Sequence, residues 1–431
     1  MRKRLIFISL VLMTCPCLSA DLLTAYKKGE IKIAPDPSFG TNTIWDMLFK
    51  AEYDKRISFL PDGSFFRTAY RDGKVYRFND RGDKVAEIGQ KGQGPGDLNM
   101  PVFLDILDGK YLIVYEEGNR RFSQFELDGK FMKTAKIESQ GISMSAPLAT
   151  MVALKDNKVA LVAQDQKSTF WLKLFRVLIK DMVTGAEKDI AAFTDEKPQS
   201  PIFIRLDQFD GTVYIAMVGG NKLLIAYSKS PEIALYSFSG EKLSSFNIGI
   251  EREKIAFDHL EYVMKPDKMD KTEREGYEKV IVANRDRIRL PEFHPYYLGL
   301  TVDPEDHILL YLNNIAKKTQ DNAFRAYSTN GKLLATTKIN PGDYQVLNPY
   351  FLHFSRNYLY AALEKKGGDG SQFFARVNLE GEPALRFPLP TGTGKTRSDT
   401  LGRKPWEWVS FQRSLRSLHA SAETRTFFSP S

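Results

Sequence analysis

Six turns of one kind recur along this chain, and each stands between two short runs of hydrophobic residues. Their glycines are Gly82, Gly129, Gly185, Gly240, Gly331 and Gly381. Successive glycines are 47, 56, 55, 91 and 50 residues apart. A period of roughly 40–50 residues, with several short strands in each repeat, is typical of a β-propeller, where one repeat forms one blade. The repeat therefore predicts an all-β fold with six blades. It leaves the function open, because propellers serve many unrelated functions.

The second repeat shows most clearly what one unit contains. Its four runs, which are rich in Val, Ile, Phe and Tyr, cover residues 102–107, 111–115, 121–125 and 130–133. Asp-Gly or Gly-Asn pairs separate the runs, and such pairs supply the positive φ that a tight hairpin turn needs. We therefore predict a six-bladed β-propeller of four-stranded antiparallel blades over residues 54–390. Residues 29–34, within the N-terminal segment 21–53, are expected to add a strand that helps to close the ring.

The start of the second repeat resembles a known family. Ile88–Leu98, which reads IGQKGQGPGDL, precedes Pro101, and Glu117–Phe122 follows with the sequence EGNRRF. These residues resemble an NHL-type repeat, and the chain is similar to the bacterial exported six-bladed β-propeller family. The resemblance is specific over about residues 85–135 and looser over 50–390, because the last two repeats lack the Gly-Pro-Gly linker. It implies a six-bladed propeller and carries over no catalytic residue.

The first 20 residues have the composition of a signal peptide. Three basic residues at positions 2–4 precede an apolar run, residues 5–13, that is too short to span a bilayer. We expect cleavage near residue 20 and export to the periplasm or the extracellular space. Both cysteines, Cys15 and Cys17, lie in this segment, so the mature chain is expected to carry no disulfide. A lipoprotein acylated at Cys15 is the alternative.

The net charge of +8 lies at the two ends of the chain. Residues 2–4 supply three of these charges and residues 391–431 supply a net four, which leaves +1 for everything between. A basic body would have suggested nucleic acid. We therefore expect no nucleic-acid partner, and no other stretch is apolar enough to predict a transmembrane segment.

Two segments depart from the repeat. Residues 251–290 account for the long spacing before Gly331, and apolar residues at helical intervals on both sides of Pro266 predict two short amphipathic helices. This insert would stand between blades four and five, either as a cap packed across one rim or as a lid or docking arm over the central channel.

The tail, residues 391–431, is either a basic amphipathic helix that touches a membrane surface or an appendage, native or not, without fixed structure.

Two glycine-rich segments resemble nucleotide-binding motifs without meeting their requirements. Gly392–Thr396 ends like a phosphate-binding loop, but Leu389 stands where that motif needs a glycine. Gly92–Gly96 is followed by no predicted helix that could offer its N-terminus to a pyrophosphate. We interpret Gly92–Gly96 as a linker between blades. The chain also lacks the Gly-x-Ser-x-Gly elbow of one hydrolase class.

Histidines and aspartates are the residues that would hold a metal in a propeller channel. The five histidines are His259, His294, His307, His353 and His419, and none has His-x-His or HExxH spacing. His294, His307 and His353 stand near blade starts, where zinc is conceivable, and Asp105, Asp207 and Asp303 are candidates for calcium. Single rim histidines and turn-capping aspartates are the alternative. We expect no cofactor, with calcium or zinc as the second option.

Two functions from different classes follow. The first is an exported, non-catalytic β-propeller that binds a protein, peptide or glycan; the second is a metal-dependent lyase or lactonase acting in the propeller channel. For the first, partner binding is assigned to Phe293, His294, Tyr296 and Tyr297, an aromatic group directly after the insert. The alternative for these rings is that they only pin the insert onto blade five.

Overall fold

Four separate antiparallel sheets of four strands each follow one another along the chain. The computed structural model describes residues 22–39, 57–137, 142, 148–169, 171–200, 209–264, 266, 269–318, 322–346, 353–355, 358–367 and 372–379. The first sheet contains β2 (Ile57–Phe59), β3 (Phe65–Ala69), β4 (Lys74–Phe78) and β5 (Lys84–Ile88). The second contains β6 (Pro101–Leu107), β7 (Tyr111–Glu116), β8 (Arg121–Glu126) and β9 (Phe131–Lys136). The third contains β10 (Leu148–Ala153), β11 (Lys158–Gln164), β12 (Leu172–Asp181) and β13 (Glu187–Glu196). The fourth contains β14 (Val213–Val218), β15 (Lys222–Tyr227), β16 (Glu232–Tyr236) and β17 (Lys242–Asn247).

The remaining strands form one nine-stranded sheet. It contains β18 (Tyr297–Val302), β19 (Ile308–Leu312), β20 (Asn322–Tyr327), β21 (Leu333–Asn340), β22 (Tyr344–Val346), β23 (His353–Ser355), β24 (Tyr358–Lys365) and β25 (Gln372–Leu379), together with β1 (Glu30–Pro35). β1 follows the short helix α1 (Leu22–Lys27), and it pairs in parallel with β21 and antiparallel with β25. The repeat count predicts six separate sheets. The backbone hydrogen bonds do not separate six, because β1 joins the strands of the last two repeats into one sheet.

The turn glycines stand where the repeat predicts them. Gly82, Gly129, Gly185, Gly240 and Gly331 each lie between the third and fourth strands of a meander, all with positive φ. Gly381 lies outside the described residues. Because a side chain disfavours positive φ, glycine at this position lets the third strand reverse directly into the fourth.

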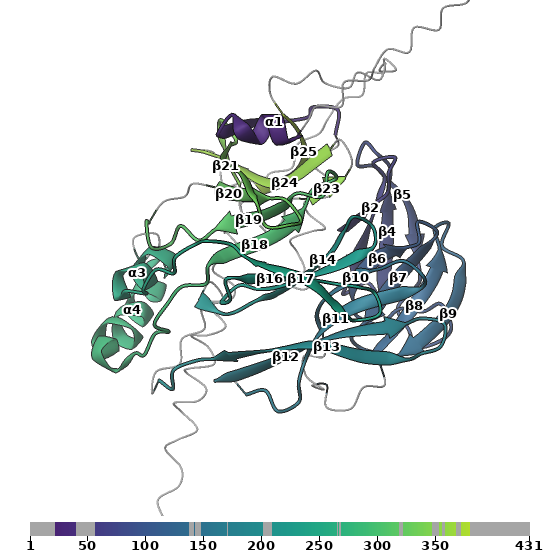
Figure 1. The fold of residues 1–431 in the computed structure, drawn as a ribbon, viewed down its shortest axis with the longest axis horizontal. Coiled ribbons are helices and arrows are strands. Elements are labelled where there is room, and N and C mark those ends of the chain that lie inside the picture. Colours follow the sequence, from purple (N-terminus) through teal and green to yellow (C-terminus); the bar gives the residue numbers. More distant parts are fainter. Residues whose placement is uncertain are drawn as a thin grey trace, which may run out of the picture.

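Each sheet packs face to face on the next one. Separate clusters of buried hydrophobic residues join the first sheet to the second, the second to the third, the third to the fourth, and the fourth to β18–β20. A further cluster joins β19–β21 to β24, β25 and β1. The last cluster returns to the first sheet, where Tyr360 of β24 stacks on Phe59 of β2 with ring centroids 4.1 Å apart. The chain is therefore an all-β propeller with four-stranded antiparallel blades, whose last strands meet its first (Figure 1).

Helices interrupt the strands between β17 and β18. α3 (Phe257–Met264), α4 (Lys271–Val280) and the 3-10 helix η3 (Val282–Arg287) project beyond the sheets in Figure 1. A capping box starts α4: the Asp270 side chain accepts from the Glu273 amide at 2.9 Å, and the Glu273 side chain accepts from the Asp270 amide at 3.0 Å. None of the helices in the described part of the chain is long and apolar enough to cross a membrane.

Candidate functional site

The two ends of the strands differ in how much irregular chain they carry. In the first four sheets, the turns between first and second strands and between third and fourth strands are short, and we call this the turn end. The opposite end carries the turns between second and third strands and the connections between sheets, and we call it the loop end. The described part of its connections includes residues 197–200 and 209–212, before β14, and most of 248–296, before β18. Long irregular segments on a rigid scaffold are where binding residues concentrate, so the loop end is the candidate site.

A short stem holds both ends of the helical segment together. Lys254 and Phe293 form an isolated antiparallel bridge. The amide of His294 donates to the carbonyl of Glu253 at 2.9 Å, and the amide of Ile255 donates to the carbonyl of Glu292, also at 2.9 Å. Above this stem the helices have their own small core, which includes Leu260, Met264, Met269, Tyr277, Ile281 and Ile288. Among the residues that the structure describes, Phe209 and Ile315 are its only buried members from outside residues 251–290.

Arg252 lies at the foot of the stem between two aromatic rings. Its guanidinium carbon is 5.0 Å from the Phe293 ring centroid and 5.4 Å from that of Tyr296. Nε donates to the carbonyl of His294 at 3.1 Å, and Nη2 donates to the carbonyl of Phe293 at 3.3 Å. The ring contacts and the two hydrogen bonds fix the guanidinium in one orientation.

Two histidines meet where α3 packs on the stem. His259 Nδ1 and His294 Nε2 are 2.9 Å apart, and His259 Nδ1 also accepts from the Ala256 amide at 3.2 Å. Because His259 Nδ1 is already an acceptor, we assign the proton between the rings to His294 Nε2. His294 Nδ1 is then an acceptor, and it has no hydrogen-bond partner among the described residues although it is buried. The Phe209 ring packs edge-on against the His294 ring, with the ring centroids 5.3 Å apart.

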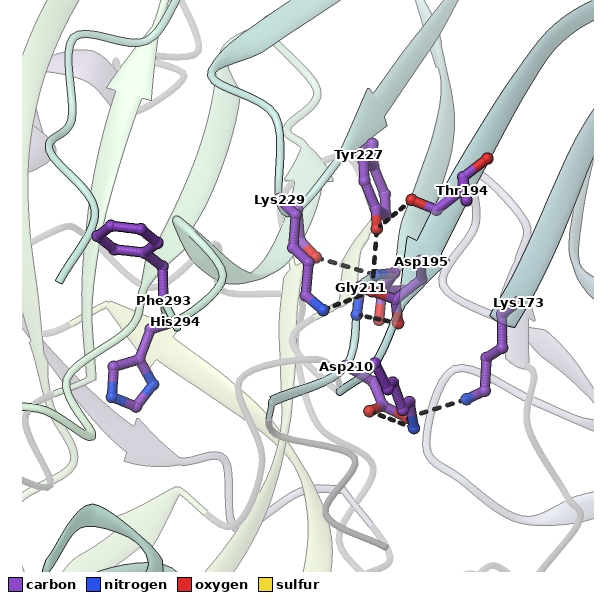
Figure 2. Close-up of polar contacts among 12 residues, drawn as sticks. Lys173, Thr194, Asp195, Asp210, Gly211, Tyr227, Lys229, Phe293 and His294 are labelled. Carbon is purple, nitrogen blue, oxygen red and sulfur yellow. Dashed lines mark hydrogen bonds and ion pairs between the residues drawn. The ribbon is translucent and has the colours of Figure 1, made fainter. Parts of the chain in front are cut away.

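Asp195, near the end of β13, is the centre of a buried polar group (Figure 2). It accepts hydrogen bonds from Lys229 Nζ, from the Tyr227 hydroxyl at 3.2 Å and from the Gly211 amide at 3.0 Å. Burial, followed by the charge of Asp195, raises the pKa of Tyr227, so the phenol keeps its proton and acts as a donor. The side chain of Asp195 therefore ties β13 to the start of β14 and to the β15–β16 turn.

Asp210 forms the second half of this group. Its carboxylate lies 2.9 Å from Lys173 Nζ and 2.6 Å from Lys197 Nζ. Burial pushes the pKa of Asp210 upward, but the charges of Lys173 and Lys197 outweigh it and hold that pKa below its usual value. Burial also lowers the pKa of Lys197, against the opposing effect of Asp210. We call Lys173, Lys197, Lys229, Asp195 and Asp210 the lysine–aspartate cluster.

The structure divides the four residues that the sequence assigns to partner binding. Tyr297 is 0% exposed and packs between the fourth sheet and β18, and His294 is 2% exposed. Neither offers a surface to a partner, because adjacent sheets and α3 cover them. Phe293 and Tyr296 are half-buried, and they hold Arg252. Their rings thus contact Arg252 at the foot of the insert and remain partly exposed.

Among the proposed metal ligands in the described part of the chain, only Asp303 and His307 come together. Asp105 accepts from Ser58 Oγ and from the Ala153 amide, each at 2.8 Å, and so links β6 to its two neighbouring sheets. Asp303 accepts from the Tyr26 hydroxyl and lies against His307 Nδ1, each at 2.9 Å. No group of three or more His, Cys, Asp or Glu side chains able to hold a metal occurs among the described residues. Asp207, His419 and the side chain of His353 lie outside them.

The lysine–aspartate cluster, Arg252 and the histidine pair are functional candidates that no sequence pattern predicts. The cluster members stand at the ends of β12 and β13, in the connection before β14 and in the β15–β16 turn, where charged residues are common. Their spacing matches no motif, and nothing in the sequence says that residues 173, 197 and 210 meet. One sequence feature could have indicated Arg252: it stands at the start of a segment that ends in aromatic residues.

The chain matches no protein-family model and no curated protein sequence. Solved structures with similar folds include a putative exported protein from Bacteroides fragilis, 13% identical with a TM-score of 0.45, over 81% of this chain and 95% of that one. A member of the duf4221 family from Bacteroides vulgatus is 11% identical with a TM-score of 0.45, over 82% and 99%. Virginiamycin B lyase from Staphylococcus aureus is 12% identical with a TM-score of 0.40, over 77% and 82%. Similarity of this extent assigns no activity to this chain.

Proposed function

We propose that this protein is an exported, non-catalytic, six-bladed β-propeller that binds a ligand at its loop end. The observation that carries the proposal is that the loop end holds the helical insert, the Arg252 sandwich and the lysine–aspartate cluster together on the irregular side of the scaffold. The turn end has only short turns in the first four sheets. Export is proposed from the signal-peptide composition of residues 1–20, which lie outside the described residues.

The count of six blades is proposed from packing. Six clusters of buried residues lie between successive sheets, provided that the nine-stranded sheet is divided at β1. In that division β18–β21 form the fifth blade. β22–β25 form the sixth, with β1 as its outer strand. A ring whose last blade takes a strand from the N-terminus leaves few open sheet edges.

Deletion of the insert tests the binding proposal. Replacing residues 257–288 by a short Gly-Ser bridge keeps Arg252 and the stem. Of the eight buried core members that the structure describes, six leave with the insert. The propeller should therefore stay folded, while the variant should no longer retain the envelope component that the intact mature protein captures. A Gly-Ser replacement of the turn 237–241, at the turn end, is the matched control and should capture normally.

Two results would contradict the proposal. Undiminished capture by the folded deletion variant would show that the insert face is not the binding face. Metal-dependent turnover of a lactone or of a cyclic peptide by the intact protein would favour the lyase or lactonase instead.

A further inference from the structure

A short segment of the connection before β14 joins the helical insert to the propeller. Phe209 is 2% exposed and belongs to the small core of the insert, and its ring packs edge-on against the His294 ring. The carboxylate of Asp210, the next residue, belongs to the lysine–aspartate cluster, and the Gly211 amide donates to Asp195 of the same cluster. We call residues 209–211 the link, because its first residue packs in the insert and its other two are held by the propeller.

The propeller holds the last two residues of the link from several sides (Figure 2). Lys173 of β12 and Lys197, just after β13, lie 2.9 and 2.6 Å from the Asp210 carboxylate. Gly211 passes directly against Tyr227 of β15, since a Cβ at this glycine would overlap the Tyr227 ring. Strands of the third and fourth sheets therefore fix the backbone on the propeller side of Phe209.

Among the residues that the structure describes, Phe209 is one of two buried side chains that the propeller contributes to the small core. The other is Ile315, and Leu298 packs against the same core partly buried. Asp258 of α3 pairs with Lys318, but their side chains are 47% and 44% exposed, and ion pairs so exposed contribute little. The stem fixes where the insert is attached, whereas side-chain packing has to fix the direction in which the insert points.

We propose that the lysine–aspartate cluster is a clamp that sets the orientation of the helical insert, with Phe209 as the positioning residue. A buried ion pair contributes little net stability, but a displaced link would deprive Lys173 and Lys197 of their carboxylate, so one arrangement is specified. The clamped link holds Phe209, and Phe209 holds the insert. A partner that meets a preset insert loses less ordering entropy than one that meets an insert swinging on its stem. The proposal deepens the proposed function and rests on it, because it names what positions the binding face.

The distance between two nitroxide spin labels measures this orientation. Lys279→Cys on α4 and Lys136→Cys on β9 put the labels on exposed positions, and the two natural cysteines lie in the expected signal peptide. We expect the labelled mature protein to give one narrow distance distribution. Phe209→Ala should broaden or shift it by several ångströms, because it leaves a cavity where the insert is anchored. Phe209→Leu, which keeps most of the apolar volume, should stay close to the parent.

Asp210→Asn tests the clamp without altering the small core. It removes the carboxylate from between the two lysines and should broaden the distribution as Phe209→Ala does. Glu187→Gln is the matched control, since it takes a carboxylate from Lys180, whose side chain is 1% exposed, at the opposite end of β13. It should leave the distribution unchanged. Hydrogen exchange of α4 reports whether the insert itself stays folded, and where Phe209→Ala unfolds it, Asp210→Asn decides.

A broad distribution in the parent, or an unchanged one in folded Phe209→Ala or Asp210→Asn, would overturn the proposal. Equal broadening in Glu187→Gln would do so as well, because the effect would then not be specific to the clamp. If the distributions do not change but deletion of residues 257–288 abolishes capture of the envelope component, the clamp fails and the binding function stands. If they change as expected but the deletion variant captures normally, the binding function fails instead.

Discussion

Gly331 and Gly185 occupy equivalent turns but differ in what surrounds them. Both have positive φ, +84° and +78°. A Cβ on Gly331 would lie 2.3 Å from the Phe246 ring, whereas a Cβ on Gly185 would meet nothing within 4 Å. We predict that Gly185→Ala lowers the free energy of unfolding by about 1–2 kcal/mol through backbone strain alone. Gly331→Ala should lower it clearly more, because Phe246 must also move. Urea unfolding of both variants checks this, and equal losses would contradict the packing of Phe246 against that turn.

The pairing of Lys229 with Asp195 makes the loss of one partner more damaging than the loss of both charges. Asp195 has a fully buried side chain, and the Lys229 side chain is 11% exposed. Lys229→Met leaves an uncompensated buried carboxylate and should lower the free energy of unfolding by about 3–5 kcal/mol. Adding Asp195→Asn should recover a substantial part of that loss. A double variant no more stable than Lys229→Met would show that the lysine does not balance Asp195.

The histidine pair should make the attachment of α3 sensitive to acid. Burial, followed by the charges of His259 and Arg252, lowers the pKa of His294 to about 4 from an ordinary value of 6.5. The other charged groups at this contact are Asp258, 3.7 Å from His259, and Lys318, which pairs with Asp258. Between pH 6.5 and 4 the unfolded chain binds a proton that folded His294 does not. The contribution of neutral His294 to the free energy of unfolding is therefore complete above pH 6.5. As the pH falls to 4, the free energy of unfolding decreases by about 3 kcal/mol.

Hydrogen exchange of residues 253–264 as a function of pH measures this effect. Protection should decrease below pH 6.5, once the intrinsic pH dependence of exchange is subtracted, and His294→Gln should remove most of that decrease. A corrected pH profile that is identical in the variant would exclude His294 as the cause.

At the scale of elements, the sequence predicts local structure well and long-range pairing poorly. The four runs of the second repeat match β6–β9 within a few residues, because alternating apolar residues and Asp-Gly turns act locally. α3 and α4 fall within the segment where helical spacing predicts them. The sequence predicts a ring-closing strand at residues 29–34. No local pattern says which strand it pairs with, because the parallel pairing of β1 with β21 joins residues about 300 positions apart. The lysine–aspartate cluster was missed for the same reason, since its charges come from two strand ends, the connection before β14 and the β15–β16 turn.

The whole molecule depends on β1, because this strand holds the last strands of the ring together. Ile33 is 2% exposed and belongs to the cluster that joins β19–β21 to β24 and β25, whereas Lys32 on the same strand is exposed. Ile33→Ala should lower the free energy of unfolding by about 2–4 kcal/mol. Lys32→Ala should change it by less than about 0.5 kcal/mol. Comparable effects of the two substitutions on thermal or urea unfolding would mean that β1 is not packed into the ring.

The location of the bound ligand tests most directly the claim that this propeller binds at its loop end. Hydrogen–deuterium exchange of the mature protein would be compared with and without the envelope component that it captures. We expect new protection in segments 171–173, 228–231, 251–256 and 292–296, which carry Lys173, Lys229, Arg252 and the stem, and in α3 and α4, whose deletion should abolish capture. Protection confined to the turns at residues 62–63, 108–109 and 156–157, at the turn end, would contradict it.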